Sequence, residues 1–153
     1  HERRGRRGKP FTIYKFQTMK NSTPNCATGE LENPDQYITK FGRILRKTSL
    51  DELPQLWNIL KGDMSFVGPR PLISSEIRAH RLRLEYGVYR FRPGLTGWAQ
   101  VNGRDDISLM KKMKLDKEYC DNWSIGLDLK ILWRSVEVCI KQEGFHEGKL
   151  HRR

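Results

Sequence analysis

The feature that most constrains this chain is the segment 48–62, which reads TSLDELPQLWNILKG. Its apolar residues recur at positions 50, 53, 56, 57 and 60, which is a helical spacing. Asp51 and Glu52 stand near its start, and Ser49 precedes Glu52 by the three residues of a capping box. The segment therefore predicts a helix that begins near Ser49 and ends at the final glycine. Pro54 favours a start one or two residues later, because proline is accommodated only in the first turn.

The two carboxylates allow two interpretations. Acidic residues in a first turn usually act as caps, because the backbone N–H groups and the helix dipole there attract negative charge. The neighbourhood favours chemistry instead: Arg46 lies upstream, and a stiff turn at 68–71 (GPRP) presents Arg70. Arginines bind phosphate oxygens, and a carboxylate can attack phosphorus or hold a divalent cation. These residue types together favour phosphate chemistry.

This part of the chain resembles a known family. The runs SLDELPQLWN (49–58), GDMS (62–65) and VGPRP (67–71) resemble the signature of the bacterial sugar transferases, the monotopic polyprenyl-phosphate phosphoglycosyl transferases. Such enzymes start exopolysaccharide, O-antigen and glycoprotein glycan assembly. Similar runs at 10–19, 92–104 and 115–132 extend the resemblance over roughly residues 1–140.

The whole chain is one basic domain by length and charge. Its 153 residues are enough to bury a core, and its net charge of +11 implies an anionic partner. Nucleic acid, an anionic membrane face and phosphorylated ligands all satisfy that charge. The three cysteines show no metal-binding or disulfide spacing, which favours a reducing compartment, and the four histidines are interpreted as surface residues.

The remaining patterns predict an α+β fold, a compact single domain that is mostly helical with a short strand pair or hairpin. Residues 10–19 alternate as a strand, with Phe11, Ile13 and Tyr14 toward the core. Residues 37–47, 72–89 and 127–140 show helical spacing, and 20–36 is a loop. We expect a catalytic domain over 1–142 and a basic C-terminal tail over 143–153.

A second dense stretch, RPGLTGWAQVNGR, covers residues 92–104. Gln100, Asn102 and Arg104 alternate along it, so they would share one side if the stretch were extended. Amide and guanidinium groups on one side suit a nucleobase edge or a diphosphate. The alternative is a polar hairpin with no ligand.

The resemblance implies a mechanism and roles for individual residues. A sugar 1-phosphate would pass from a nucleotide-diphosphate sugar, UDP-linked, to a polyprenyl phosphate, giving a polyprenyl-diphosphate sugar and UMP. Asp51 would be the nucleophile and Glu52 the ligand of a Mg²⁺ cofactor. The phosphate-binding residues would be Lys15, Arg46 and Arg70, and the nucleotide-binding residues Gln100, Asn102 and Arg104. Gln17 departs from the family pattern, which has an arginine there.

The second substrate implies a membrane partner. Residues 1–9, HERRGRRGK, form a basic arm that could be simply solvated or contact anionic lipid or nucleic acid. No run approaches a membrane-spanning helix. The chain begins at His1, so we expect an upstream segment, which the resemblance implies is a hydrophobic re-entrant helix. The enzyme would then act at the cytoplasmic face of the bacterial inner membrane.

Two other classes compete with the enzyme. A nucleic-acid-binding module is disfavoured, because the aromatic and basic residues do not interleave and no binding motif is present. We therefore expect no nucleic-acid partner. A non-catalytic membrane-surface module is disfavoured by the retained Asp51–Glu52 pair. The sequence leaves the sugar, the lipid length, the glycan pathway and the oligomeric state open.

Overall fold

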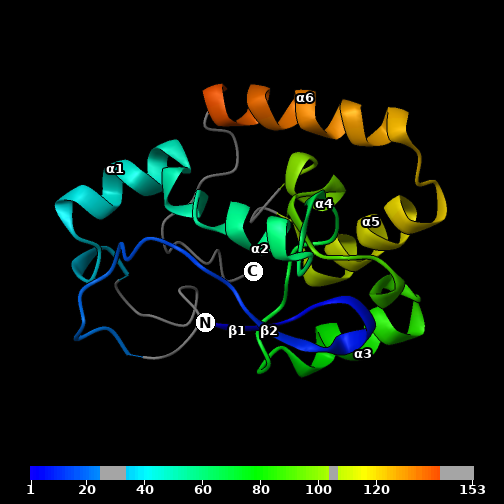
Figure 1. Cartoon of the computed structure of the whole chain (residues 1–153), viewed down its shortest axis with the longest axis horizontal. Helices are drawn as coiled ribbons and strands as arrows, with labels where there is room; N and C mark the ends of the chain where they lie inside the picture. The colour runs from blue at the N-terminus through cyan, green and yellow to red at the C-terminus, as the bar shows by residue number, and fades with distance from the viewer. Residues whose placement is uncertain (25–33, 104–106, 142–153) are drawn as a thin grey trace.

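A computed structural model of the protein describes residues 1–24, 34–103 and 107–141. Helices predominate in this part of the chain, and two sheets of two strands each accompany them (Figure 1). The predicted α+β class is therefore confirmed. The proposed tail at 143–153 lies outside the described residues, so the boundary at residue 142 stays a prediction.

The basic N-terminal segment is folded. Strand β1 (Glu2–Arg4) pairs antiparallel with β2 (Pro10–Thr12), and the turn η1 (Arg6–Gly8) joins them. The interpretation of residues 1–9 as a free arm is therefore wrong. Beside this hairpin, a bridge from Arg4 to Leu72 ties β1 to the segment that follows the GPRP turn.

The predicted strand at 10–19 is shorter than expected. Its strand part ends at Thr12, and Met19 further on forms an isolated bridge with Ile38. Ile13 is buried as predicted, whereas Phe11 is half-buried and Tyr14 is exposed. Ile13 still exchanges hydrogen bonds with His1, and the amide of Tyr14 then donates to a side chain, as described below.

The helix predicted at 37–47 is present as α1 (Lys40–Thr48), whereas the helix predicted from Ser49 is divided into a 3₁₀ turn and a shorter α-helix. After the short turn η3 (Pro34–Gln36), helix α1 is capped by Thr39, whose Oγ1 accepts from the amide of Gly42. A 3₁₀ turn, η4 (Leu50–Glu52), follows, and α2 (Gln55–Lys61) ends at Gly62 in the left-handed conformation.

The predicted capping box is wrong. Ser49 itself is left-handed, with φ 58°, and its side chain makes no cap bond. Pro54 occupies the N-cap position of α2 and delays the helix to Gln55, because a proline has no N–H to donate. The two carboxylates therefore stand in a separate turn ahead of the helix rather than in its first turn.

A parallel strand pair forms the centre of the fold. Strand β3 (Ser65–Val67) runs beside β4 (Gly94–Thr96). The backbones approach so closely that a Cβ on Gly94 would lie 2.1 Å from the amide nitrogen of Gly68. The buried core beside the pair is formed by Val67, Val88, Val101, Tyr119, Cys120 and Ile131.

The C-terminal half supplies the remaining helices. They are α3 (Ile77–Glu85), the short turn η5 (Val88–Arg90), α4 (Trp98–Val101), α5 (Leu109–Asp121) and α6 (Ile125–Lys141). The helix predicted at 72–89 is shorter, because Glu76 Oε2 accepts from the amide of Ile73 in a preceding turn and the left-handed Gly87 follows its end. The terminal helix predicted at 127–140 is confirmed by α6.

Helix α6 has two different apolar faces. Its inner face carries Ile131, which is 0 % exposed. Its outer face carries an exposed apolar stripe within an arc of about 100° at ideal helical geometry; we call this the α6 outer stripe, and it consists of Ile125, Leu129, Leu132, Trp133, Val136 and Ile140. In Figure 1 this helix lies along one edge of the molecule. No helix in the described ranges is long and apolar enough to cross a bilayer.

Candidate active site at the Asp51–Glu52 turn

The turn η4 presents both carboxylates to a lysine. Lys15 Nζ lies 2.6 Å from Glu52 Oε1 and 3.9 Å from Asp51 Oδ2. The side chains are partly exposed, at 25 % for Lys15, 23 % for Glu52 and 13 % for Asp51. The structure thus brings together three residues that the sequence analysis named, from two segments 36 positions apart. This group remains open to a ligand because none of the three is fully buried.

Arg46 adds a second positive charge near the Asp51 carboxylate. Its Nε donates to Thr18 Oγ1 at 2.9 Å, which fixes the guanidinium at the end of α1. Burial raises the pKa of the Asp51 carboxyl above its ordinary value. The charge of Lys15 acts against this rise, the neighbouring Glu52 adds to it, and the charge of Arg46 also acts against it. Asp51 is therefore a more basic carboxylate than a solvated aspartate.

Asn58 positions the lysine segment, and the sequence analysis missed this role. Its side chain is 0 % exposed; Oδ1 accepts from the amide of Tyr14 at 3.0 Å and Nδ2 donates to the carbonyl of Thr12 at 2.7 Å. The amide of Phe16 then donates to the carbonyl of Asp51 at 3.0 Å. These bonds align residues 12–16 with α2 and η4. The signal in the sequence was a polar residue between the apolar Trp57 and Ile59, but the sequence did not indicate its partners.

Arg70 occupies a different position from the other cations. It is exposed in the turn between the buried Pro69 and Pro71, as expected for a presented arginine. Its charge acts on Arg3, whose pKa is lowered first by burial and then by Arg70. Among the described residues no hydrogen bond or ion pair joins Arg70 to Asp51. A direct role for Arg70 in positioning the carboxylates is therefore not seen in the geometry, and its role toward phosphate stays a prediction.

The glycine-rich stretch does not form the predicted extended face. Residues 98–101 are helical in α4, and positions two apart in a helix do not share a face. Gln100 Nε2 donates to the carbonyl of Leu95 at 3.3 Å, and its Oε1 is buried without a hydrogen-bond partner. Asn102 Oδ1 accepts from Arg134 at 2.9 Å, and its Nδ2 donates to the carbonyl of Trp98. Arg104 lies outside the described residues.

The described ranges contain no group of three or more His, Cys, Asp or Glu side chains placed to hold a metal ion. A Mg²⁺ ion, however, commonly takes only one or two protein carboxylates and completes its shell with water and substrate phosphates. The partly exposed Asp51–Glu52 pair fits that donor set, with Lys15 as a competitor for Glu52.

His80 is not a surface residue as predicted, because it is half-buried and contacts Tyr89 and the carbonyl of Ile73.

Comparison with known proteins identifies the family. Residues 1–142 match the bacterial sugar transferase family, so the chain belongs to that family. Over 145 residues it is 48 % identical to the uncharacterized sugar transferase EpsL of Bacillus subtilis, covering 95 % of this chain and 70 % of that protein. The resemblance found in the sequence motifs is thereby confirmed.

Two further relatives carry names that state a reaction. The undecaprenyl-phosphate galactose phosphotransferase of Salmonella typhimurium is 39 % identical over 94 % of this chain and 33 % of its own length. The UDP-glucose:undecaprenyl-phosphate glucose-1-phosphate transferase of Escherichia coli is 40 % identical over 88 % of this chain and 30 % of its own. The chain thus spans about a third of these two longer proteins.

Proposed function

We propose that this protein transfers a sugar 1-phosphate from a UDP-sugar to a polyprenyl phosphate, as the first step of exopolysaccharide, O-antigen or glycan assembly. The family membership and the names of the relatives support the reaction class. The observation that carries the proposal is the cluster of Asp51, Glu52 and Lys15 in one partly exposed turn. Carboxylates beside cations suit attack on a phosphate diester and neutralisation of its charge.

The reaction runs through two displacements at phosphorus. Asp51 attacks the β-phosphorus of the donor, a bond forms from Asp51 to phosphorus, and the bond to the UMP oxygen breaks. An oxygen of the polyprenyl phosphate then attacks the same phosphorus and releases the carboxylate. The products are UMP and a polyprenyl-diphosphate sugar. Division into two steps through an aspartyl phosphosugar is ordinary covalent catalysis.

The geometry favours Asp51 over Glu52 as the nucleophile. Glu52 Oε1 is held in a 2.6 Å contact with Lys15, whereas Asp51 Oδ2 lies 3.9 Å from the same ammonium. A carboxylate that accepts so short a hydrogen bond from a lysine ammonium is a weaker nucleophile, because the ammonium stabilises its negative charge. The raised pKa of Asp51 acts in the same direction, since a more basic carboxylate attacks better.

Glu52 is the residue we propose to hold Mg²⁺, together with phosphate oxygens of the donor. A bound Mg²⁺ would offset charge on the phosphates in the transition state. Lys15 and Arg46 flank the carboxylates and would contact phosphate oxygens as the negative charge of the donor enters. Arg70 would contact phosphate from its exposed turn. For the nucleotide we propose contacts from Gln100, Asn102 and Arg104. The side-chain amides of Gln100 and Asn102 already form hydrogen bonds within the protein, so we expect Arg104 to contribute most to nucleotide affinity.

The acceptor requires a membrane surface, and we propose the cytoplasmic face of the bacterial inner membrane. The α6 outer stripe is an exposed apolar surface, with Trp133 at 77 % and Ile140 at 76 % exposure. Exposed apolar residues of α1 and α2, among them Phe41 at 68 % and Leu60 at 78 %, add to it. Apolar helix faces flanked by cations suit a bilayer interface.

Vesicle flotation across a salt series tests membrane binding by these faces. Salt-resistant binding that is lost in Trp133→Ser supports the proposal. Binding only to anionic vesicles at low salt would assign adsorption to charge alone.

Mass spectrometry tests the central chemistry. The protein is mixed with candidate UDP-sugars, and the intact mass and the mass of the peptide containing Asp51 are measured. A phosphosugar adduct on Asp51 supports the proposal and identifies the donor. The matched control is Asp51→Asn, which preserves size and removes the nucleophile. An adduct that persists in this variant would remove Asp51 from the nucleophile's role.

A further inference from the structure

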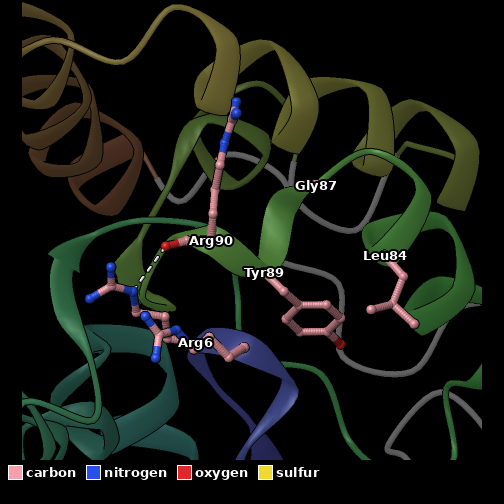
Figure 2. A pocket seen from close by; sticks show the side chains of 6 residues that line it. Arg6, Leu84, Gly87, Tyr89 and Arg90 are labelled. Atoms are coloured by element: carbon pink, nitrogen blue, oxygen red, sulfur yellow. Dashed lines mark hydrogen bonds between the residues drawn. The ribbon is translucent and has the colours of Figure 1, made fainter.

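An open groove lies between the tip of the N-terminal hairpin and the segment after α3. Its volume is about 460 Å³, and it is lined by Arg6, Arg7, Leu84, Gly87, Tyr89 and Arg90 (Figure 2). None of these residues belongs to the proposed active site. In Figure 1 the hairpin tip and α3 lie on the opposite side of the view from the turn between α1 and α2. The groove is therefore distinct from the catalytic turn.

One wall of the groove is cationic without an internal counter-ion. Arg6 Nε donates to the carbonyl of Arg90 at 3.0 Å, so its guanidinium is oriented by a neutral acceptor. Within residues 1–24, 34–103 and 107–141, no carboxylate forms a salt bridge with Arg6 or Arg7. The Arg90 side chain points away from Arg6 (Figure 2), because its Nη2 donates to the carbonyl of Cys120 and to Asp121 Oδ1. Two guanidinium groups therefore face the groove with their charge uncompensated.

The backbone at this wall is strained. Arg7 has φ 59° and ψ 23°, a left-handed conformation that is unfavourable for a residue with a Cβ. Gly8 follows with φ 70°. The turn thus keeps a long cationic side chain at a position where glycine would be the relaxed choice. The two consecutive left-handed residues close the turn so that both arginines line one groove.

The opposite wall is apolar. Leu84 is 68 % exposed at the end of α3, and the ring of Tyr89 lies between Arg6 and Leu84 (Figure 2). Tyr89 is held in place because its hydroxyl contacts His80 Nδ1, and the two rings stack at 6.1 Å. The groove therefore presents two cationic heads on one side and a fixed aromatic and aliphatic surface on the other.

We propose that this groove binds an organic phosphate, with the phosphate on Arg6 and Arg7 and its apolar or aromatic body against Tyr89 and Leu84. Guanidinium groups bind phosphate oxygens in pairs, and the exposed Leu84 beside the largely buried Tyr89 offers an apolar contact. A soluble nucleotide and a lipid headgroup both carry this chemistry. The site is independent of the proposed reaction, because it uses none of the residues assigned to that reaction.

NMR titration with phenyl phosphate and with inorganic phosphate tests the site. We expect amide shifts confined to residues 5–9 and 84–90, with phenyl phosphate binding more tightly. Arg6→Gln with Arg7→Gln should weaken both ligands about tenfold or more, because two charge-assisted bonds are lost. Leu84→Ser should weaken phenyl phosphate and leave inorganic phosphate unchanged, and this exposed substitution does not disturb the core.

The matched control is Lys111→Gln with Lys114→Gln, an equal change of charge at two exposed lysines on α5. Equal weakening in both double variants would show a general charge effect and overturn the proposal, as would shifts spread over the whole basic surface. Vesicles of phosphatidylcholine with and without phosphatidylglycerol distinguish the sources. Binding of anionic vesicles that depends on Arg6 and Arg7 assigns the site to a lipid phosphate, and its absence beside phenyl phosphate binding assigns it to a soluble one.

Discussion

The two dense motifs of this sequence, at 48–62 and 92–104, use their polar residues in different ways. In the first, Asp51 and Glu52 meet Lys15 in a partly exposed turn. In the second, Gln100 and Asn102 are tied to the carbonyls of Leu95 and Trp98, beside a strand pair that admits no side chain at Gly94. Both motifs lie within the part of the chain that matches the family. The difference teaches that a run of unusual residues marks a constraint, and only the geometry says whether that constraint is chemical or structural.

The sharpest test of this contrast is Asp51→Asn. We expect loss of UMP release by about 10³-fold or more, because removal of a covalent nucleophile leaves only binding and charge effects. The thermal unfolding midpoint should stay unchanged or rise, since asparagine fits the same turn. UMP release and scanning calorimetry on the same preparation measure both quantities. A variant that loses activity through unfolding would place the first motif in the same structural class as the second.

Gly94→Ala is the corresponding change in the second motif. Its Cβ would lie 2.1 Å from the amide nitrogen of Gly68, so the strand pair must separate. We expect a loss of about 3 kcal/mol in the free energy of unfolding, at the upper end for overpacking. Denaturant titration measures it, and Gly126→Ala in α6, where an added Cβ meets only Ser124 at 4.0 Å, is the neutral or slightly stabilising control.

The nucleotide assignment separates Arg104 from Asn102. Arg104→Ala should raise the KM for the UDP-sugar by roughly 10- to 150-fold with little change for the lipid acceptor, because a charge-assisted bond to phosphate is lost. Asn102→Ala should instead lower the free energy of unfolding by about 1–2 kcal/mol, since Arg134 loses its acceptor. Steady-state kinetics with both substrates, beside denaturant titration, resolve the two. If Arg104→Ala changed the KM for both substrates equally, the whole 92–104 stretch would have a structural role rather than a nucleotide-binding one.

The smallest expected effect concerns pH. Burial raises the pKa of Asp51 above its unfolded value, so the folded state binds the proton more tightly. Stability contributed by this group is therefore full in acid and lost as pH rises through the raised folded-state pKa. Asp51→Asn should be more stable than the parent at neutral pH, with the difference vanishing at low pH. Asp121→Asn should show the opposite sign, because hydrogen bonding to Lys117 lowers the pKa of Asp121.

Helix positions were predicted accurately from the sequence, whereas helix boundaries were predicted poorly. The helical spacings at 37–47 and 127–140 are local, and both segments form helices, α1 and α6. The basic residues 2–4 were missed as a strand because their partner, β2, lies across a turn whose left-handed Arg7 has no recognisable sequence signal. The start of α2 was misplaced because a capping-box spacing was given more weight than Pro54.

The candidate site was predicted in part for the same reason. Lys15, Arg46, Asp51 and Glu52 were named from motifs, and the structure places them together. Asn58 was missed because its role depends on the backbone of Thr12 and Tyr14, more than 40 positions away. Gln100 and Asn102 were assigned to a shared face by assuming an extended chain, whereas the residues around Trp98 are helical.

The buried Asn58 allows the integrity of the candidate active site to be measured through the exchange of single amides. The Tyr14 N–H can exchange with solvent only when its bond to Asn58 opens, and that opening also frees the segment carrying Lys15. Local opening exposes amides at a free energy below that of global unfolding. If Tyr14 and Phe16 exchange together and faster than the amides of α5, the site can come apart while the domain stays folded. The protection factor of the Tyr14 amide would then report the fraction of molecules in which Lys15 and the proposed catalytic turn are held together.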